Sequence, residues 1–200
     1  MKTENRLEDE RLIDLARSGD PKAFCDIYEQ IKDSLYRYAL YRLDTREDAE
    51  DAVQECVLEA WRQIKTLRSN KAYRTWIFRI LSGCCNRRIK CVIRDRDKTG
   101  AAAGMQAAGT SGTVSLKPGV KHPASAAEDM MDPAETVTGN VQLNQALDQL
   151  EEQARDVVLL SVVGGFTSDE ISGMLGLSPG GVRSKLSRSL RKMREFLETE

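Results

Sequence analysis

The residues best suited to chemistry lie in a basic stretch at 165–190, which reads GFTSDEISGMLGLSPGGVRSKLSRSL. Arginine can donate two parallel hydrogen bonds to a guanine edge, and both arginine and lysine neutralise phosphates. The chemistry that these residues indicate is therefore recognition of DNA rather than catalysis. We expect base contacts from Arg183, Ser184 and Lys185, with Arg188 nearby, and phosphate contacts from Thr167, Ser178 and Gly180 through backbone N–H groups.

Two short helices joined by a tight turn would position these side chains. Thr167 and Glu170 have the spacing of a capping box, and Gly176 suits a left-handed helix end. Ser178 can cap a second helix that has Pro179 at its first position. The pattern predicts a helix-turn-helix, whose second helix enters the DNA major groove.

A second basic segment, 79–98, holds seven basic and two acidic residues in a chain whose net charge is only −1. Two separate basic patches indicate two contacts with nucleic acid. The alternative is that these side chains merely offset helix dipoles.

The five cysteines and the single histidine form no CxxC pair, and the sequence contains no phosphate-binding loop or nucleophile–base pair. We therefore expect no catalytic residues, no metal site, no cofactor and no small-molecule substrate. Cys25 and Cys56 lie at apolar helix positions and are expected to be buried. The charged N-terminus and the absence of a long apolar run predict a cytoplasmic protein that is not inserted in a membrane.

Apolar spacing predicts an all-α fold of two small helical domains, an N-terminal bundle at 8–96 and a C-terminal helix-turn-helix bundle at 139–197. The first domain is expected to hold helices at 8–18, 20–43, 45–64 and 72–94. The last of these should bend or weaken at Gly83-Cys84-Cys85, since glycine is a poor helix former. Residues 97–138 are rich in Gly, Ala, Ser and Thr, which predicts a flexible linker.

An acidic helix reading EDAEDAVQECVLEAW, then YRTWIFRI, then a linker and the helix-turn-helix resemble a bacterial RNA polymerase sigma factor of the extracytoplasmic-function (ECF) group. The resemblance implies that the protein binds core RNA polymerase, directs it to promoter DNA and helps to open the duplex. The first domain would match sigma region 2 and the second would match sigma region 4. An anti-sigma factor that holds the protein inactive is common in the family.

The resemblance also implies site residues. Asp51, Gln54 and Glu55 match the positions that dock on the polymerase clamp. Residues that read and melt the minus-ten element would be Asn70, Lys71, Arg74, Arg79, Arg87 and Arg88. Trp76 and Phe78 could stack on bases, but core packing is the favoured interpretation of Trp76. The family often has Asn at position 83 and Asp at position 87, where this chain has Gly83 and Arg87.

Two other functions fit parts of the sequence. A helix-turn-helix regulator that does not dock on polymerase would share the C-terminal motif, but it would not need the acidic helix followed by YRTWIFRI. A nuclease would need an acidic metal cluster beside a basic cleft, and the sequence does not indicate one.

Overall fold

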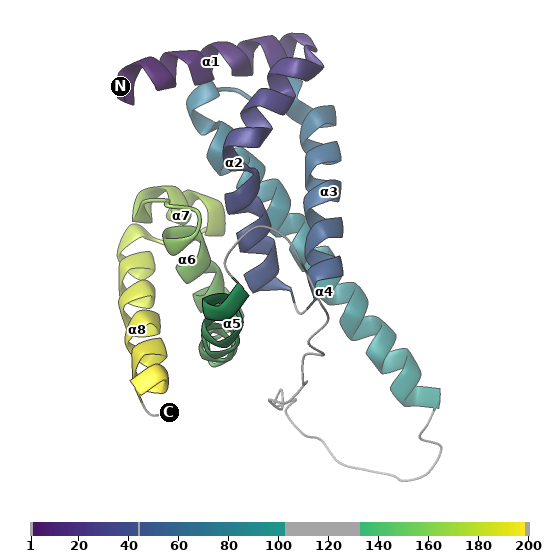
Figure 1. Cartoon of the computed structure of the whole chain (residues 1–200), viewed down its shortest axis with the longest axis vertical. Coiled ribbons are helices and arrows are strands. Elements are labelled where there is room, and N and C mark those ends of the chain that lie inside the picture. The colour runs from purple at the N-terminus through teal and green to yellow at the C-terminus, as the bar shows by residue number, and fades with distance from the viewer. Residues whose placement is uncertain (1, 44, 103–132, 199–200) are drawn as a thin grey trace.

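The computed structural model describes residues 2–43, 45–102 and 133–198, and the regular elements in these ranges are all helical (Figure 1). In chain order they are α1 (Lys2–Ser18), α2 (Pro21–Arg42), α3 (Arg46–Gln63), the short 3-10 helices η1 (Ile64–Thr66) and η2 (Asn70–Ala72), α4 (Tyr73–Ala102), α5 (Pro133–Asp148), α6 (Glu152–Val162), α7 (Ser168–Leu175) and α8 (Pro179–Glu198). The prediction of an all-α fold with two helical domains is confirmed. Residues 103–132, the middle of the expected linker, lie outside the described residues, while α4 and α5 extend into its two edges.

The N-terminal domain packs α1 to α4 around one apolar core. Asp20 caps α2 by accepting hydrogen bonds from the backbone N–H groups of Lys22 and Ala23, and Thr45 caps α3 in the same way. Small residues of α3, such as Ala52 and Cys56, are fully buried, which lets the α3 backbone lie close to its neighbours. α4 continues without a break through Gly83, so the expected weakening of this helix is not seen.

The C-terminal domain is built from α5 to α8 on a smaller core that includes Leu147, Leu160, Ile171 and Val182. The capping box at the start of α7 is confirmed, with both reciprocal hydrogen bonds present between Thr167 and Glu170. Gly176 ends α7 in the left-handed conformation, with φ of 68°. These local signals fix the angle between the two helices of the helix-turn-helix.

The turn between α6 and α7 depends on two adjacent glycines. Gly165 has a φ of 67°, where other residues are strained. A Cβ on Gly164 would lie 2.6 Å from the Phe166 ring and 2.7 Å from the Leu160 carbonyl oxygen. Glycine at position 164 thus lets Phe166 fold back and present its ring to the N-terminal domain.

The two domains pack directly on each other, with α6 and α7 lying against α2 and the first half of α4 (Figure 1). The Phe166 ring meets the Phe78 ring edge-on, with centroids 5.0 Å apart. Phe78 is fully buried between Tyr38 and Phe166, and Trp76 is half-buried against the core. Core packing of Trp76 is therefore confirmed, and in this arrangement Phe78 has no free face for a base.

Two further expectations were tested by the structure. Cys56 is buried as expected, but the prediction for Cys25 is wrong, because its side chain is exposed. Cys25 lies between the core residues Phe24 and Ile27 in sequence but on the outer side of α2.

In the described part of the chain, every helix is too short or too polar to cross a membrane.

Candidate polymerase and nucleic-acid interfaces

The acidic face of α3 carries the three residues expected to dock on polymerase. Asp51, Gln54 and Glu55 are all exposed there. Two of them are paired with arginines that we expected to contact DNA. Arg88 reaches Asp51 at 2.6 Å, and Arg87 reaches Glu55 at 3.0 Å. Two members of each set of predicted site residues therefore face each other across the α3–α4 contact.

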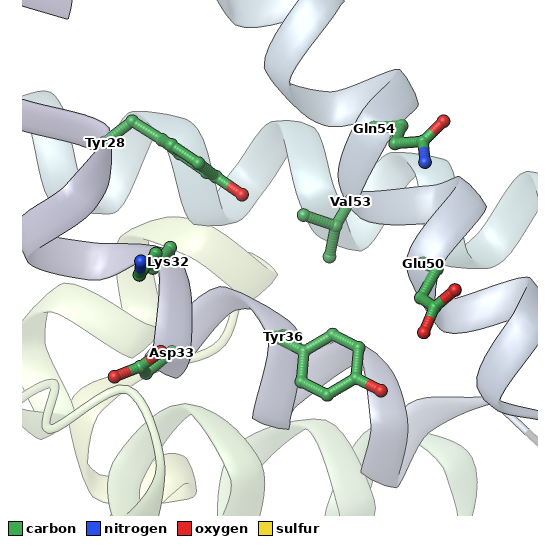
Figure 2. Close-up of a pocket in the computed structure, with 7 residues that line it drawn as sticks. All are labelled: Tyr28, Lys32, Asp33, Tyr36, Glu50, Val53 and Gln54. Atoms are coloured by element: carbon green, nitrogen blue, oxygen red, sulfur yellow. The ribbon is translucent and has the colours of Figure 1, made fainter. Parts of the chain in front are cut away.

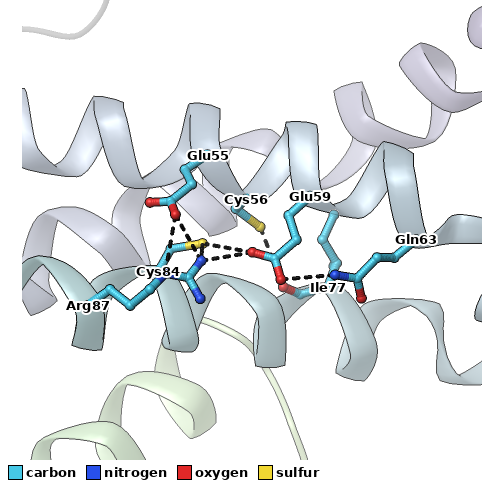
Figure 3. A network of polar contacts seen from close by, with 7 residues as sticks. All are labelled: Glu55, Cys56, Glu59, Gln63, Ile77, Cys84 and Arg87. Atoms are coloured by element: carbon cyan, nitrogen blue, oxygen red, sulfur yellow. Dashed lines mark hydrogen bonds and ion pairs between the residues drawn. The ribbon is translucent and has the colours of Figure 1, made fainter.

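Each arginine also bonds to a second carboxylate on α3. Arg88 lies 3.2 Å from Asp48, and Arg87 lies 2.8 Å from Glu59 (Figure 3). The side chain of Arg87 is half-exposed, so water screens its ion pairs and each contributes only about 0–1 kcal/mol. The carboxylates of α3 thus partly neutralise Arg87 and Arg88, but such weak ion pairs do not hold the two side chains in one position.

Glu55, Glu59 and Cys84 bring three potential metal ligands within 4.8 Å of one another. The guanidinium group of Arg87 fills the space between them, since it also contacts the Cys84 Sγ at 3.2 Å (Figure 3). Burial raises the pKa of the Cys84 thiol to about 11, so the thiol stays protonated at neutral pH. We interpret these groups as counter-ions and packing partners of Arg87.

A groove of about 340 Å³ lies between α2 and α3, directly beside the acidic face (Figure 2). Gln54 and Val53 line it from α3, and two tyrosines line it from α2. The groove was not predicted from the sequence. Tyr28 and Tyr36 are eight residues apart on α2, a spacing that places them on about the same helix face and could have indicated a shared surface. The lining residues are Tyr28, Lys32, Asp33, Tyr36, Glu50, Val53 and Gln54.

The loop before α4 is held against α1. The Asn70 side-chain amide donates to the Glu10 carbonyl at 3.0 Å and to the Asp14 carboxylate at 2.8 Å, and it accepts from Arg17 at 3.3 Å. Lys71 is exposed beside it. Asn70 therefore positions the loop, while Lys71 is available to a ligand.

Arg74 and Arg79, on the first two turns of α4, point toward the C-terminal domain. Arg74 donates to the Gly164 carbonyl at 3.0 Å and stacks over the Phe166 ring at 5.5 Å from its centroid. Arg79 donates to the Gly173 carbonyl at 2.9 Å. Two of the arginines expected to bind the minus-ten element thus contact the α6–α7 turn and α7 in this structure.

The recognition helix α8 presents its basic face to solvent. Arg183, Ser184 and Arg188 are exposed, and the Nε of Arg188 donates to the Ser184 carbonyl at 3.2 Å. Lys185 lies 3.3 Å from Glu151. Among the described residues, Arg183 and Ser184 have the clearest access to a DNA groove.

The three residues of this motif that were expected to contact phosphates differ in how available they are to a ligand. Gly180 and Ser178 lie exposed at the start of α8, where Ser178 accepts from the Gly181 N–H at 3.1 Å. The Thr167 N–H is already bonded to Glu170 at 2.8 Å, so this group is not available to a phosphate. The start of α8 is therefore the better anchor for the DNA backbone.

A helical domain with an exposed acidic face, followed by a helix-turn-helix domain with a basic second helix, is typical of a DNA-binding protein. Two family models match the chain, "Sigma-70 region 2" over residues 27–95 and "Sigma-70, region 4" over residues 140–193. The chain is 25% identical over 189 residues to the ECF RNA polymerase sigma factor SigW of Bacillus subtilis, covering 92% of this chain and 94% of that protein. It is 41% identical over 75 residues to the RNA polymerase sigma factor CarQ of Myxococcus xanthus, covering 38% of this chain and 41% of CarQ.

Solved structures share the fold. CnrH, in complex with the cytosolic domain of CnrY, matches with a TM-score of 0.66 and 20% identity over 96% of this chain and 99% of that chain. The sigma factor RpoE of Bartonella quintana, in complex with the anti-sigma factor NepR, matches with a TM-score of 0.63 and 20% identity over 90% of this chain and 99% of that chain. The chain belongs to the bacterial sigma factors, in the ECF group. It is a promoter-recognition factor that acts with core RNA polymerase.

Proposed function

We propose that the acidic face of α3 and the adjoining groove form the polymerase docking surface, with Asp51, Gln54 and Glu55 as contact residues. The observation that carries this proposal is the side-by-side placement of exposed carboxylates and a groove with two tyrosines. Carboxylates steer a basic partner and set its orientation, while tyrosines at a groove supply contact area. A basic helical surface of the polymerase would fit both parts.

In the same proposal, the domain at 8–96 reads the minus-ten element and the domain at 139–197 reads the minus-35 element. The exposed Lys71 and the arginines of α4, namely Arg74, Arg79, Arg87 and Arg88, would hold the displaced strand through its phosphates. Asn70 would act by fixing the loop rather than by direct contact. Extruding a base costs a few kcal/mol, which these contacts and the polymerase would offset.

The C-terminal domain would bind upstream DNA through α8. Arg183 and Ser184 would reach base edges, Lys185 and Arg188 would lie on neighbouring bases or phosphates, and Ser178 and Gly180 would meet the backbone. The segment 97–138 would join the two domains. Even the 30 residues between α4 and α5 can reach about 100 Å when extended, enough for more than one DNA turn of about 34 Å.

We further propose that the protein is not an enzyme, that it acts in the cytoplasm, and that an anti-sigma factor is one of its partners. The last point is supported by the complexes that CnrH and RpoE form with CnrY and NepR. The decisive experiment is binding to purified core RNA polymerase, followed by runoff transcription from a library of genomic promoters. Failure of the intact, folded chain to bind core polymerase would refute the proposal and favour a regulator that does not dock.

A further inference from the structure

The contact between the two domains contains a buried polar cluster. Arg42, on the last turn of α2, donates through Nε to the Asp156 carboxylate of α6 at 2.8 Å. Tyr38 donates its hydroxyl to the same carboxylate oxygen at 3.1 Å. The exposed fractions of Tyr38, Arg42 and Asp156 are 0%, 4% and 7%. An ion pair therefore lies almost wholly inside the domain contact.

Arg42 makes two further polar contacts in the closed arrangement. Its Nη2 donates to Asn86 of α4 at 3.0 Å and to Glu152 of α6 at 2.6 Å. The Arg42 guanidinium thus joins α2, α4 and α6 at one point. Burying a charge is costly unless a partner of opposite charge and hydrogen bonds compensate it. Arg42 and Asp156 are therefore stable either as a buried pair or when both are exposed to water, and unstable when only one of them is buried.

The same closed arrangement engages the DNA-binding surface of α4. Arg74 and Arg79 bond to carbonyl groups of Gly164 and Gly173, and Phe166 packs on Phe78. A DNA strand on this surface would have to displace the α6–α7 turn. In contrast, Asp51 and Gln54 on α3 and Arg183 on α8 remain exposed.

We propose that Tyr38, Arg42 and Asp156 form an interdomain latch that keeps the free protein closed and keeps Arg74 and Arg79 of its minus-ten surface bound to the C-terminal domain. This inference rests on the proposed function of α4. The latch is autoinhibitory and acts within one chain, without a second protein. Opening it transfers Arg42 and Asp156 to water, frees Arg74 and Arg79, and separates the Phe166 ring from Phe78.

The latch predicts a selective defect. Because closure leaves α3 exposed, latch variants should dock on polymerase much as the wild type does. Because closure engages Arg74 and Arg79 of α4, they should bind single-stranded DNA more tightly, since apparent affinity is reduced to the extent that molecules are not in the competent state.

The test uses the full chain and the variant Asp156→Lys, which places a second cation beside Arg42. The matched control is Asp148→Lys, because Asp148 pairs with Arg155 inside the C-terminal domain and has a half-exposed side chain. Small-angle X-ray scattering of the free proteins gives the radius of gyration, and circular dichroism checks the helix content. A second variant, Tyr38→Phe, keeps the ring in the core and removes only the hydroxyl.

We expect Asp156→Lys to raise the radius of gyration by several ångströms at unchanged helix content, with a smaller change for Tyr38→Phe and none for Asp148→Lys. We also expect Asp156→Lys to bind a fluorescein-labelled single-stranded DNA oligonucleotide of mixed sequence at least about tenfold more tightly in an anisotropy titration. Equal radii for wild type and both latch variants would overturn the latch. An opened variant with unchanged DNA affinity would overturn its inhibitory role. Failure of the wild type to bind core polymerase would refute the proposed function instead, and the scattering result would still stand.

Discussion

Neutralising Asp51 and Glu55 together should separate polymerase docking from folding. The variant Asp51→Asn with Glu55→Gln keeps the size and shape of both side chains and removes two charges from the exposed face of α3. Arg88 keeps its contact with Asp48, and Arg87 keeps its contact with Glu59. The α3–α4 contact therefore loses two of four carboxylates but retains an ion pair for each arginine.

The effects on folding and on docking are of similar size but are seen in different measurements. Each lost pair has an exposed or half-exposed partner and is worth about 0.2–1 kcal/mol, so the free energy of unfolding should fall by at most about 2 kcal/mol. Each carboxylate that meets a cation on the polymerase at about 4 Å contributes about 1 kcal/mol in a water-like dielectric. Loss of both should therefore weaken binding to core polymerase by about 30-fold.

Biolayer interferometry with immobilised core polymerase measures the dissociation constant, and urea denaturation followed by circular dichroism measures stability. The control variant is Asp148→Asn with Glu151→Gln, which removes two carboxylates from surface ion pairs with Arg155 and Lys185. We expect the control to bind polymerase as the wild type does. A folded α3 variant with wild-type affinity would refute the assignment of this face to docking.

Three further predictions concern single features. Arg183→Ala should relax base preference in the upstream element, whereas Arg191→Ala, which removes a side chain that is 73% exposed, should weaken binding to all DNA sequences equally. Selection from a random DNA library distinguishes the two effects. Identical sequence profiles for both variants and the wild type would show that the recognition surface is misplaced. Gly164→Ala should lower the free energy of unfolding by about 1–3 kcal/mol, because the new methyl group overlaps the Phe166 ring; urea denaturation measures this, and an unchanged midpoint would contradict the close packing. Iodoacetamide at pH 8 should modify only the exposed thiols of the native protein, Cys25 and Cys91, as counted by mass spectrometry. Burial raises the pKa of Cys84 to about 11 and that of Cys85 to about 12, and it also raises the pKa of Cys56, so these three thiols stay protonated and unreactive. Early modification of the three buried thiols would contradict this.

The features predicted best from sequence are those set by neighbouring residues. Thr167 and Glu170 form the capping box because both of its hydrogen bonds span only three residues. Gly176 ends α7 because the backbone conformation there favours glycine over other residues. The helix-turn-helix could therefore be located by local rules, and so could the starts of α2 and α3.

Side-chain position on a helix was less predictable where neighbouring apolar residues share a turn. Cys25 follows Phe24 directly, yet Phe24 faces the core and Cys25 faces solvent, because successive residues on a helix point about 100° apart. The arginines of α4 were expected to face DNA, and four of them contact other parts of the protein. Their sequence positions give the charge of the surface but not the partner that each charge meets.

The domain contact could not be derived from sequence, and Asp156 explains why. It follows Arg155 and directly precedes the apolar residues Val157 to Leu160, so the local sequence does not show whether it faces the core or solvent. Its partner, Arg42, lies 114 residues earlier in the chain, and no local pattern joins the two. A buried carboxylate on α6 is affordable only if a cation from elsewhere meets it, because burial of one unpaired charge costs several kcal/mol. The requirement for a partner thus follows from physical chemistry, but its identity follows only from the packing of α6 on α2. It is this packing that makes one arginine at the end of α2 decisive for whether Arg74 and Arg79 of α4 are engaged or free.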